Sequence, residues 1–91
     1  MISDLLAIGH ERPTSGKQLA DALGCDIREV TAAIERERRA GIPICAGLDG
    51  YYLAANKAEL TTYSKRLFKR AGNLMKTYRC LKKEIPRLPD D

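Results

Sequence analysis

Glycines divide the first 50 residues of the chain into short segments, and this limits what those segments can fold into. Gly24 and Gly41 follow two stretches with helical periodicity, while Gly47 and Gly50 enclose a short turn. Helices often end at glycine because glycine readily adopts the left-handed conformation that follows a last helical turn. The spacing therefore predicts two short helices followed by a tight hairpin.

Both helices carry start signals in the sequence. Ser15 followed by Gln18, and Asp26 followed by Glu29, have the spacing of a capping box, in which each side chain bonds to the other residue's backbone amide. We therefore expect helices over residues 16–23 and 27–40. Their inward-facing positions are the apolar residues Leu19, Ala20 and Leu23 in the first helix and Ile27, Val30, Ala33 and Ile34 in the second.

Short apolar runs lie on either side of these two helices. Before them, a first short helix ending at Gly9 is expected, with Ile2, Leu5, Leu6 and Ile8 on one face. After them, Pro43 prevents further helix, and the Asp49-Gly50 pair between two apolar runs is a strong hairpin signal. The first 55 residues thus read as three short helices and a hairpin.

A long helix is predicted from Lys57 to about Ile85, with Asn56 as its cap and Glu59 at the capping-box position. Leucine recurs in it every seven residues, and further apolar or small residues fill the intermediate positions, as in a coiled-coil seam. The predicted pairing residues are Leu60, Leu67, Ala71, Leu74, Tyr78 and Leu81. Tyr63, Phe68 and Met75 widen the stripe. We expect this helix to join two copies of the chain, and the alternative is a core helix that completes one monomer.

The charge of the chain is divided unevenly. Residues 1–56 hold six Lys or Arg against eight Asp or Glu, a net charge of −2. Residues 57–91 hold ten Lys or Arg against four acids, a net charge of +6. The basic character therefore belongs to the predicted long helix and not to the segments before it.

Several classes of protein are disfavoured by the sequence. Cys25, Cys45 and Cys80 are widely spaced and His10 is the only histidine, so we expect reduced thiols and no metal site. No apolar run approaches the length of a membrane helix and the N-terminus lacks a signal peptide, which favours a cytoplasmic protein. Neither a glycine-rich phosphate loop nor a clustered catalytic set is evident. We expect no enzyme activity, no cofactor and no small-molecule ligand.

A family resemblance is carried by residues in the first three-fifths of the chain. These residues are Ser15-Gly16-Lys17-Gln18-Leu19-Ala20, Leu23-Gly24, Val30, Ile34, Arg38, Gly41-Ile42-Pro43-Ile44 and Gly50-Tyr51-Tyr52-Leu53. Together they resemble the winged helix-turn-helix family. Within it, they are most similar to domains of the biotin-repressor type and to small prophage regulators. The resemblance covers residues 1–54 and implies a mostly α fold with a small β-hairpin wing. The expected organisation is a winged helix-turn-helix domain over residues 1–55, a long C-terminal helix over 56–86 and a disordered tail over 87–91.

The resemblance implies sequence-specific binding to double-stranded DNA by a prophage or bacterial transcriptional regulator, with helix 27–40 in the major groove. Helical geometry places Arg28, Ala32, Glu35 and Arg39 outward, with Thr31 and Arg36 on the flanks. The expected base contacts come from Arg28, Thr31, Ala32 and Glu35. The expected phosphate contacts come from Ser15, Lys17, Arg36 and Arg39.

Three residues or segments depart from the pattern of this family. Asp26 opens the second helix, where a carboxylate caps well but repels a phosphate. Glu37 stands in an inward sector where leucine is usual, so we expect it to have a basic partner or partial exposure. The wing turn, residues 47–50, holds no Lys or Arg. These features leave open an alternative function, a protein-protein interaction module built on the same scaffold and the leucine-rich helix.

Overall fold

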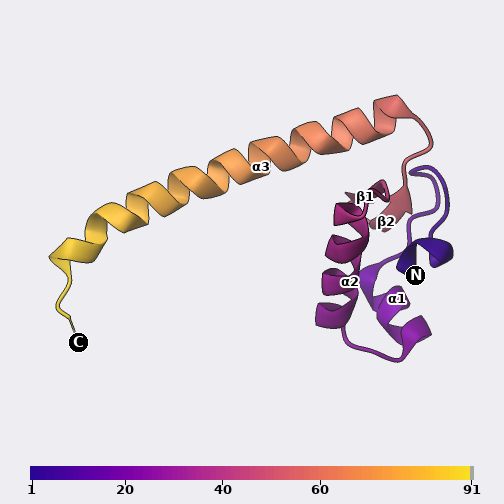
Figure 1. Ribbon diagram of the computed structural model, residues 1–91, viewed down its shortest axis with the longest axis horizontal. Helices are drawn as coiled ribbons and strands as arrows, with labels where there is room; N and C mark the ends of the chain where they lie inside the picture. The colour runs from indigo at the N-terminus through magenta and orange to yellow at the C-terminus, as the bar shows by residue number, and fades with distance from the viewer. Residues whose placement is uncertain (91) are drawn as a thin grey trace.

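A computed structural model describes residues 1–90 of the chain. The elements are, in order, the 3-10 helix η1 (Ile2–Leu5), α1 (Gly16–Leu23), α2 (Ile27–Arg39), β1 (Ile44–Gly47), β2 (Gly50–Leu53), α3 (Lys57–Glu84) and the 3-10 helix η2 (Ile85–Arg87). The elements before α3 form a head, and α3 leaves it as a long rod whose end lies far from the head (Figure 1). This is the predicted mostly helical fold with one hairpin, and its topology is compatible with a winged helix-turn-helix.

The starts of α1 and α2 are held by the predicted capping boxes. Ser15 Oγ accepts from the Gln18 amide at 3.1 Å, and Gln18 Oε1 accepts from the Ser15 amide at 2.9 Å. Asp26 and Glu29 make the same reciprocal pair at the start of α2. Gly24 ends α1 in the predicted left-handed conformation, at φ 65° and ψ 35°. The turn between the two helices is therefore short and fixed at both ends.

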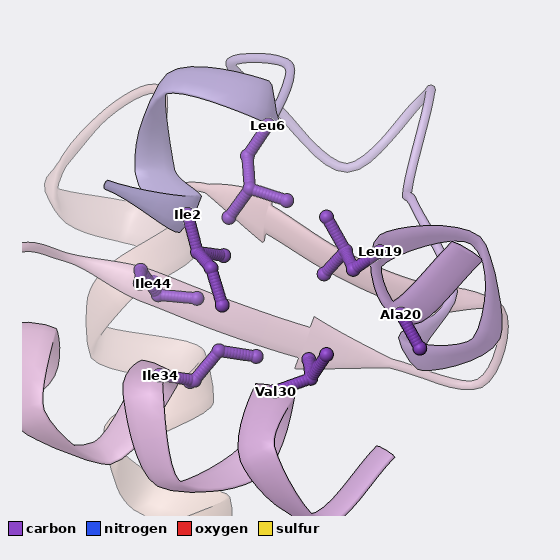
Figure 2. Close-up of a cluster of buried hydrophobic side chains, with 7 residues drawn as sticks. All are labelled: Ile2, Leu6, Leu19, Ala20, Val30, Ile34 and Ile44. Carbon is purple, nitrogen blue, oxygen red and sulfur yellow. The ribbon is translucent and has the colours of Figure 1, made fainter. Parts of the chain in front are cut away.

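The core of the head is aliphatic and draws on four elements. Figure 2 shows the seven side chains converging from η1 and the turn after it, α1, α2 and β1: Ile2, Leu6, Leu19, Ala20, Val30, Ile34 and Ile44. Burial of a large aliphatic side chain contributes about 1.5–3 kcal/mol. This small cluster is therefore the main source of stability in the head.

Four apolar residues predicted to face inward are exposed instead: Leu5, Ile8, Leu23 and Ile27. The predicted N-terminal helix is a 3-10 helix of only four residues, so the helical period that was to bury Ile8 ends before it. Ile8 instead forms an isolated bridge with Leu53. Ile27 is the first residue of α2, where it lies beside Gly16 at the rim of the head.

The hairpin has the predicted tight turn, with Gly47 paired to Gly50 and Cys45 to Tyr52. The other edge of β2 is also covered. Thr14 exchanges both backbone hydrogen bonds with Tyr51, at 2.9 and 2.8 Å. Gly50 has a φ of 141°, and a Cβ there would lie 2.4 Å from the Thr14 carbonyl oxygen. Glycine is thus required for this close approach.

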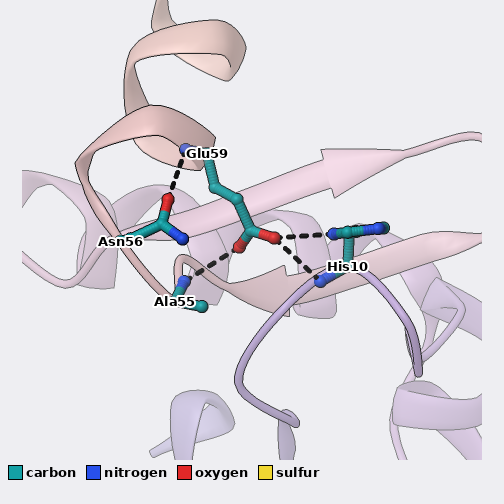
Figure 3. A network of polar contacts seen from close by, with 4 residues as sticks. All are labelled: His10, Ala55, Asn56 and Glu59. Atoms are coloured by element: carbon teal, nitrogen blue, oxygen red, sulfur yellow. Dashed lines mark hydrogen bonds and ion pairs between the residues drawn. The ribbon is translucent and has the colours of Figure 1, made fainter.

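Asn56 caps α3 as predicted, since its Oδ1 accepts from the Glu59 amide at 3.0 Å. The predicted capping box is wrong, however, because Glu59 does not return to the Asn56 amide. Its carboxylate accepts from the Ala55 amide at 2.9 Å and contacts His10 Nδ1 at 2.6 Å (Figure 3). The hydrogen bond to Glu59 raises the pKa of His10, and the bonds from His10 and Ala55 lower the pKa of Glu59. This network ties the start of α3 to the loop after η1.

The rest of α3 lies away from the head. None of its 28 residues is buried. The radius of gyration of the Cα atoms is 16.8 Å, against about 12 Å for a compact chain of this length. The residues predicted as a disordered tail begin in η2 with Arg87, continue without regular structure over 88–90, and end at Asp91, which lies outside the described residues. Within residues 1–90, no helix is long and apolar enough to cross a membrane.

Candidate nucleic-acid interface

The outward face of α2 forms a continuous exposed stripe. Arg28, Ala32, Glu35 and Arg39 succeed one another at helical spacing, and all four are exposed. The opposite face of α2 is buried in the core through Val30 and Ile34. The packing of the head therefore leaves this stripe free for a ligand.

The start of α1 lies next to the start of α2 and the wing. A Cβ at Gly16 would lie 3.8 Å from the Tyr51 ring and 4.0 Å from the Ile27 side chain. Lys17 is exposed beside this junction, while Ser15 is half-buried and its hydroxyl is engaged with the Gln18 amide. Of the two predicted phosphate contacts on α1, Lys17 is therefore the one whose side chain is free.

The cations of this region are uncommitted. Within residues 1–90, none of Lys17, Arg28, Arg36 and Arg39 forms an ion pair within 4.0 Å. Each therefore keeps its donors available for a phosphate or a base edge. Arg36 lies toward η1, where it lines a hollow with Met1, Asp4 and Leu5, so it stands at the flank of the stripe.

Two predicted base contacts have their polar atoms engaged. Thr31 Oγ1 donates to the Ile27 carbonyl oxygen at 3.0 Å. Glu35 Oε1 accepts from Arg38 Nη1 at 3.2 Å. Thr31 can still offer its methyl group to a thymine methyl and Glu35 its second carboxylate oxygen to a base donor, while Arg28 and Ala32 have no such internal bond.

Glu37 corrects a prediction, because it is buried and has no basic side-chain partner. It is 7% exposed, and its two carboxylate oxygens accept from the Ile2 and Ser3 amides, each at 2.9 Å. Desolvation raises the pKa of Glu37, but these hydrogen bonds outweigh it and hold the pKa below the ordinary value. The carboxylate is compatible with the core because free amides at the start of η1 bind it.

Arg38 has a role that sequence reasoning did not foresee. Its Nε donates to the Ile44 carbonyl oxygen at 2.9 Å, and its guanidinium carbon lies 5.1 Å from the Tyr63 ring centroid. Arg38 thus joins α2 to β1 and to α3. No local signal could have shown this, because Tyr63 and Ile44 come close to Arg38 only in the folded chain.

The wing is a weak candidate for phosphate contacts. Leu48 is fully exposed at its tip, next to the exposed carboxylate of Asp49.

The cysteines Cys25, Cys45 and Cys80 are free thiols. Among the described residues, no group of three or more potential metal ligands is found.

No protein-family model matches the chain, and neither a curated protein nor a solved structure shows significant similarity to it. The function must therefore be inferred from the surface of the molecule.

Proposed function

We propose that this chain is a sequence-specific double-stranded DNA-binding protein of the winged helix-turn-helix type, acting as a bacterial or prophage transcriptional regulator. The observation that carries the proposal is the exposed stripe of Arg28, Ala32, Glu35 and Arg39 on the second helix of a capped helix-turn-helix. A helix of this kind fits the major groove, which is about 12 Å wide.

Each residue of the stripe has a chemical match in the groove. The Arg28 guanidinium, unpaired in the head, can donate two hydrogen bonds to guanine O6 and N7. The methyl group of Ala32 can pack on the thymine methyl. Arg39, Lys17 and, at the flank, Arg36 suit the phosphates on either side of the groove. Glu35 can accept from cytosine N4 through Oε2, since only its Oε1 contacts Arg38.

The charge distribution bears on how strongly one head can bind. Residues 1–56 carry a net charge of −2, and the wing has no cation to hold the backbone. The electrostatic part of DNA binding must therefore draw on the few free cations of the head and on the basic α3. We expect weak binding by a single head and stronger binding when two heads act together.

The test is selection of bound duplexes from a random-sequence library with the full chain, followed by titration of the selected duplex. A single consensus should emerge, and affinity should fall steeply between about 50 and 200 mM salt. Arg28→Ala should relax selectivity at one base pair by about 1–3 kcal/mol. Arg39→Ala should weaken binding to all sequences alike and reduce the salt slope by about one.

Arg87→Ala is the matched control, since it also removes one exposed arginine but lies in η2, after α3 and outside the outward stripe of α2. It should leave the consensus unchanged. The proposal fails if no sequence is enriched, or if Arg28→Ala and Arg87→Ala bind the same duplexes equally well.

A protein-protein interaction module is the second candidate function. The acidic charge of residues 1–56 and the uncovered face of α3 favour it. In that case the double variant Arg28→Ala, Arg39→Ala should bind the protein partner as well as the unmodified chain does, while a change on α3 should abolish binding.

A further inference from the structure

The face of α3 that continues past the head is apolar and uncovered. Leu60 and Leu67, near the head, are 39% and 41% exposed, whereas Leu74, Leu81 and Ile85 beyond it are 64–68% exposed. Exposed apolar residues on α3 and the segment after it also include Phe68, Met75, Tyr78 and Leu88. Soluble chains seldom leave so long an apolar stripe in water, so a partner is expected on it.

The head partly shields the first part of this stripe. Leu60, Ser64 and Leu67 face Ile42 and Pro43 across a cleft of about 240 Å³. In a parallel pair of helices, both heads would lie side by side at the same end, whereas an antiparallel pair places them at opposite ends. The stripe from Leu67 onward is open to a second helix, and the cleft at its start has room for a single side chain.

We propose that a second copy of this chain covers the stripe, with its α3 running antiparallel and the two helices crossing near Lys76. Residues at equal distances before and after Lys76 then lie opposite each other. Leu67 faces Ile85 of the second copy, Ala71 faces Leu81, and Leu74 faces Tyr78. The proposed pairing is argued only from α3 and the cleft beside it, so it does not depend on whether the head binds DNA.

Size and charge both favour this register. The small Ala71 lies opposite the large Leu81, as close packing of helices requires. On the flank of the seam the pairing is offset by two residues, so that Arg70 lies beside Glu84 of the second copy, the only acid of α3 other than Glu59. In the single chain Glu84 contacts Arg87 at 3.2 Å, in an exposed pair that is easily exchanged. A parallel pair would place Arg70 beside Met75 instead, because residues five positions apart then meet.

The same register brings the end of one chain to the cleft of the other. Leu88 of the second copy falls opposite Ser64, at the apolar cleft that Leu60 and Pro43 line. Leu88 is 69% exposed in the single chain. Burial of each large apolar side chain removes on the order of 100 Å² from water. Eight such residues on each copy reach the roughly 800 Å² per partner that a stable interface needs.

Disulfide trapping tests the orientation. In a Cys25→Ala, Cys80→Ala background, with the buried Cys45 retained, Ala71→Cys and Leu81→Cys are made as separate proteins. Antiparallel pairing places Ala71 about 15 Å from its own counterpart, so neither protein should form a disulfide-linked dimer alone. A mixture of the two should give the mixed disulfide. Linked dimers of either protein alone would overturn the antiparallel arrangement.

Light scattering of the full chain tests the pairing itself. The mass should be twice the 10.1 kDa of one chain at micromolar concentration. Leu74→Lys should raise the dissociation constant by at least about 100-fold, because each dimer contains this layer twice. Lys76→Ala, on the opposite face of α3, is the matched control and should leave the mass unchanged. A monomeric mass for the unmodified chain, or equal masses for Leu74→Lys and Lys76→Ala, would contradict the proposal.

Discussion

The head and α3 solve the problem of folding in different ways. In the head, seven aliphatic side chains from four elements and the turn after η1 are buried together, and both α1 and α2 begin in a capping box. In α3, none of the 28 residues is buried, and its attachment depends on Arg38 beside Tyr63 and on Glu59 beside His10. The head is stabilised by its own tertiary contacts, whereas α3 depends on helix propensity and on the proposed partner that covers its apolar face.

The charges follow the same division. Residues 1–56 carry −2 and residues 57–91 carry +6, so the proposed reading surface and most of the positive charge belong to different parts of the molecule. Base recognition and electrostatic attraction are usually combined on one surface. In this molecule, base recognition and electrostatic attraction can act together only if α3 lies close enough to the duplex when one or two heads bind it.

The largest difference in stability change between the head and α3 is expected from glycine substitutions. Gly50→Ala should destabilise the head by about 4 kcal/mol, because the new Cβ meets the Thr14 backbone and breaks its bridge to Tyr51. Gly72→Ala should instead stabilise α3 by about 1 kcal/mol, since nothing lies within 4 Å of the added Cβ. Urea unfolding and far-ultraviolet circular dichroism measure the two effects. Equal effects of the two changes would contradict the contrast.

A pair of leucines makes the same comparison through packing. Leu19→Ala should destabilise the head by about 3 kcal/mol, because Leu19 is 1% exposed and its loss leaves a cavity. Leu74→Ala should not change the stability of the head. Hydrogen exchange of the Val30 and Ile34 amides isolates the head from any pairing of α3. Faster exchange of those amides in Leu74→Ala would show that α3 supports the core.

A somewhat smaller effect is expected at the buried carboxylate. Glu37→Gln should destabilise the head by about 2 kcal/mol, since two charge-assisted hydrogen bonds to the Ile2 and Ser3 amides are weakened. Because the folded pKa of Glu37 is lowered, its contribution is present above the ordinary value of 4.5 and is lost as the pH falls through the lowered pKa. Unfolding at a series of pH values should show this loss in the unmodified protein and not in Glu37→Gln.

The smallest effect on stability is expected from the pair of His10 and Glu59, which joins α3 to the head. The folded pKa of His10 is raised, so the His10 contribution is full below 6.5 and is lost as the pH rises through the raised pKa. Glu59 contributes above 4.5 and loses its contribution as the pH falls through its lowered pKa. The pair is thus strongest between pH 4.5 and 6.5. Nuclear magnetic resonance titration should show the His10 pKa falling toward its ordinary value in Glu59→Gln.

Parts of the candidate interface followed from the sequence and parts did not. Helical spacing was enough to place Arg28, Ala32 and Arg39 on one exposed face, because the geometry of a helix is local. The return of the Thr31 hydroxyl to the Ile27 carbonyl is also a local contact that Ser and Thr often make in helices. The contacts of Arg38 could not be predicted from the sequence, because they join residues of three different elements.

The sequence by itself determined where α1, α2, α3 and the hairpin begin and end, because caps, glycines and prolines act on the backbone within a few residues of them; the extent of η1 was not determined in this way. The tertiary structure alone decided what Glu37 and Glu59 bind, since their partners Ile2 and His10 lie 35 and 49 residues away. It also decided the direction in which α3 leaves the head. That direction, set by contacts between distant residues, leaves the leucine stripe of α3 uncovered, although its periodicity was plain in the sequence.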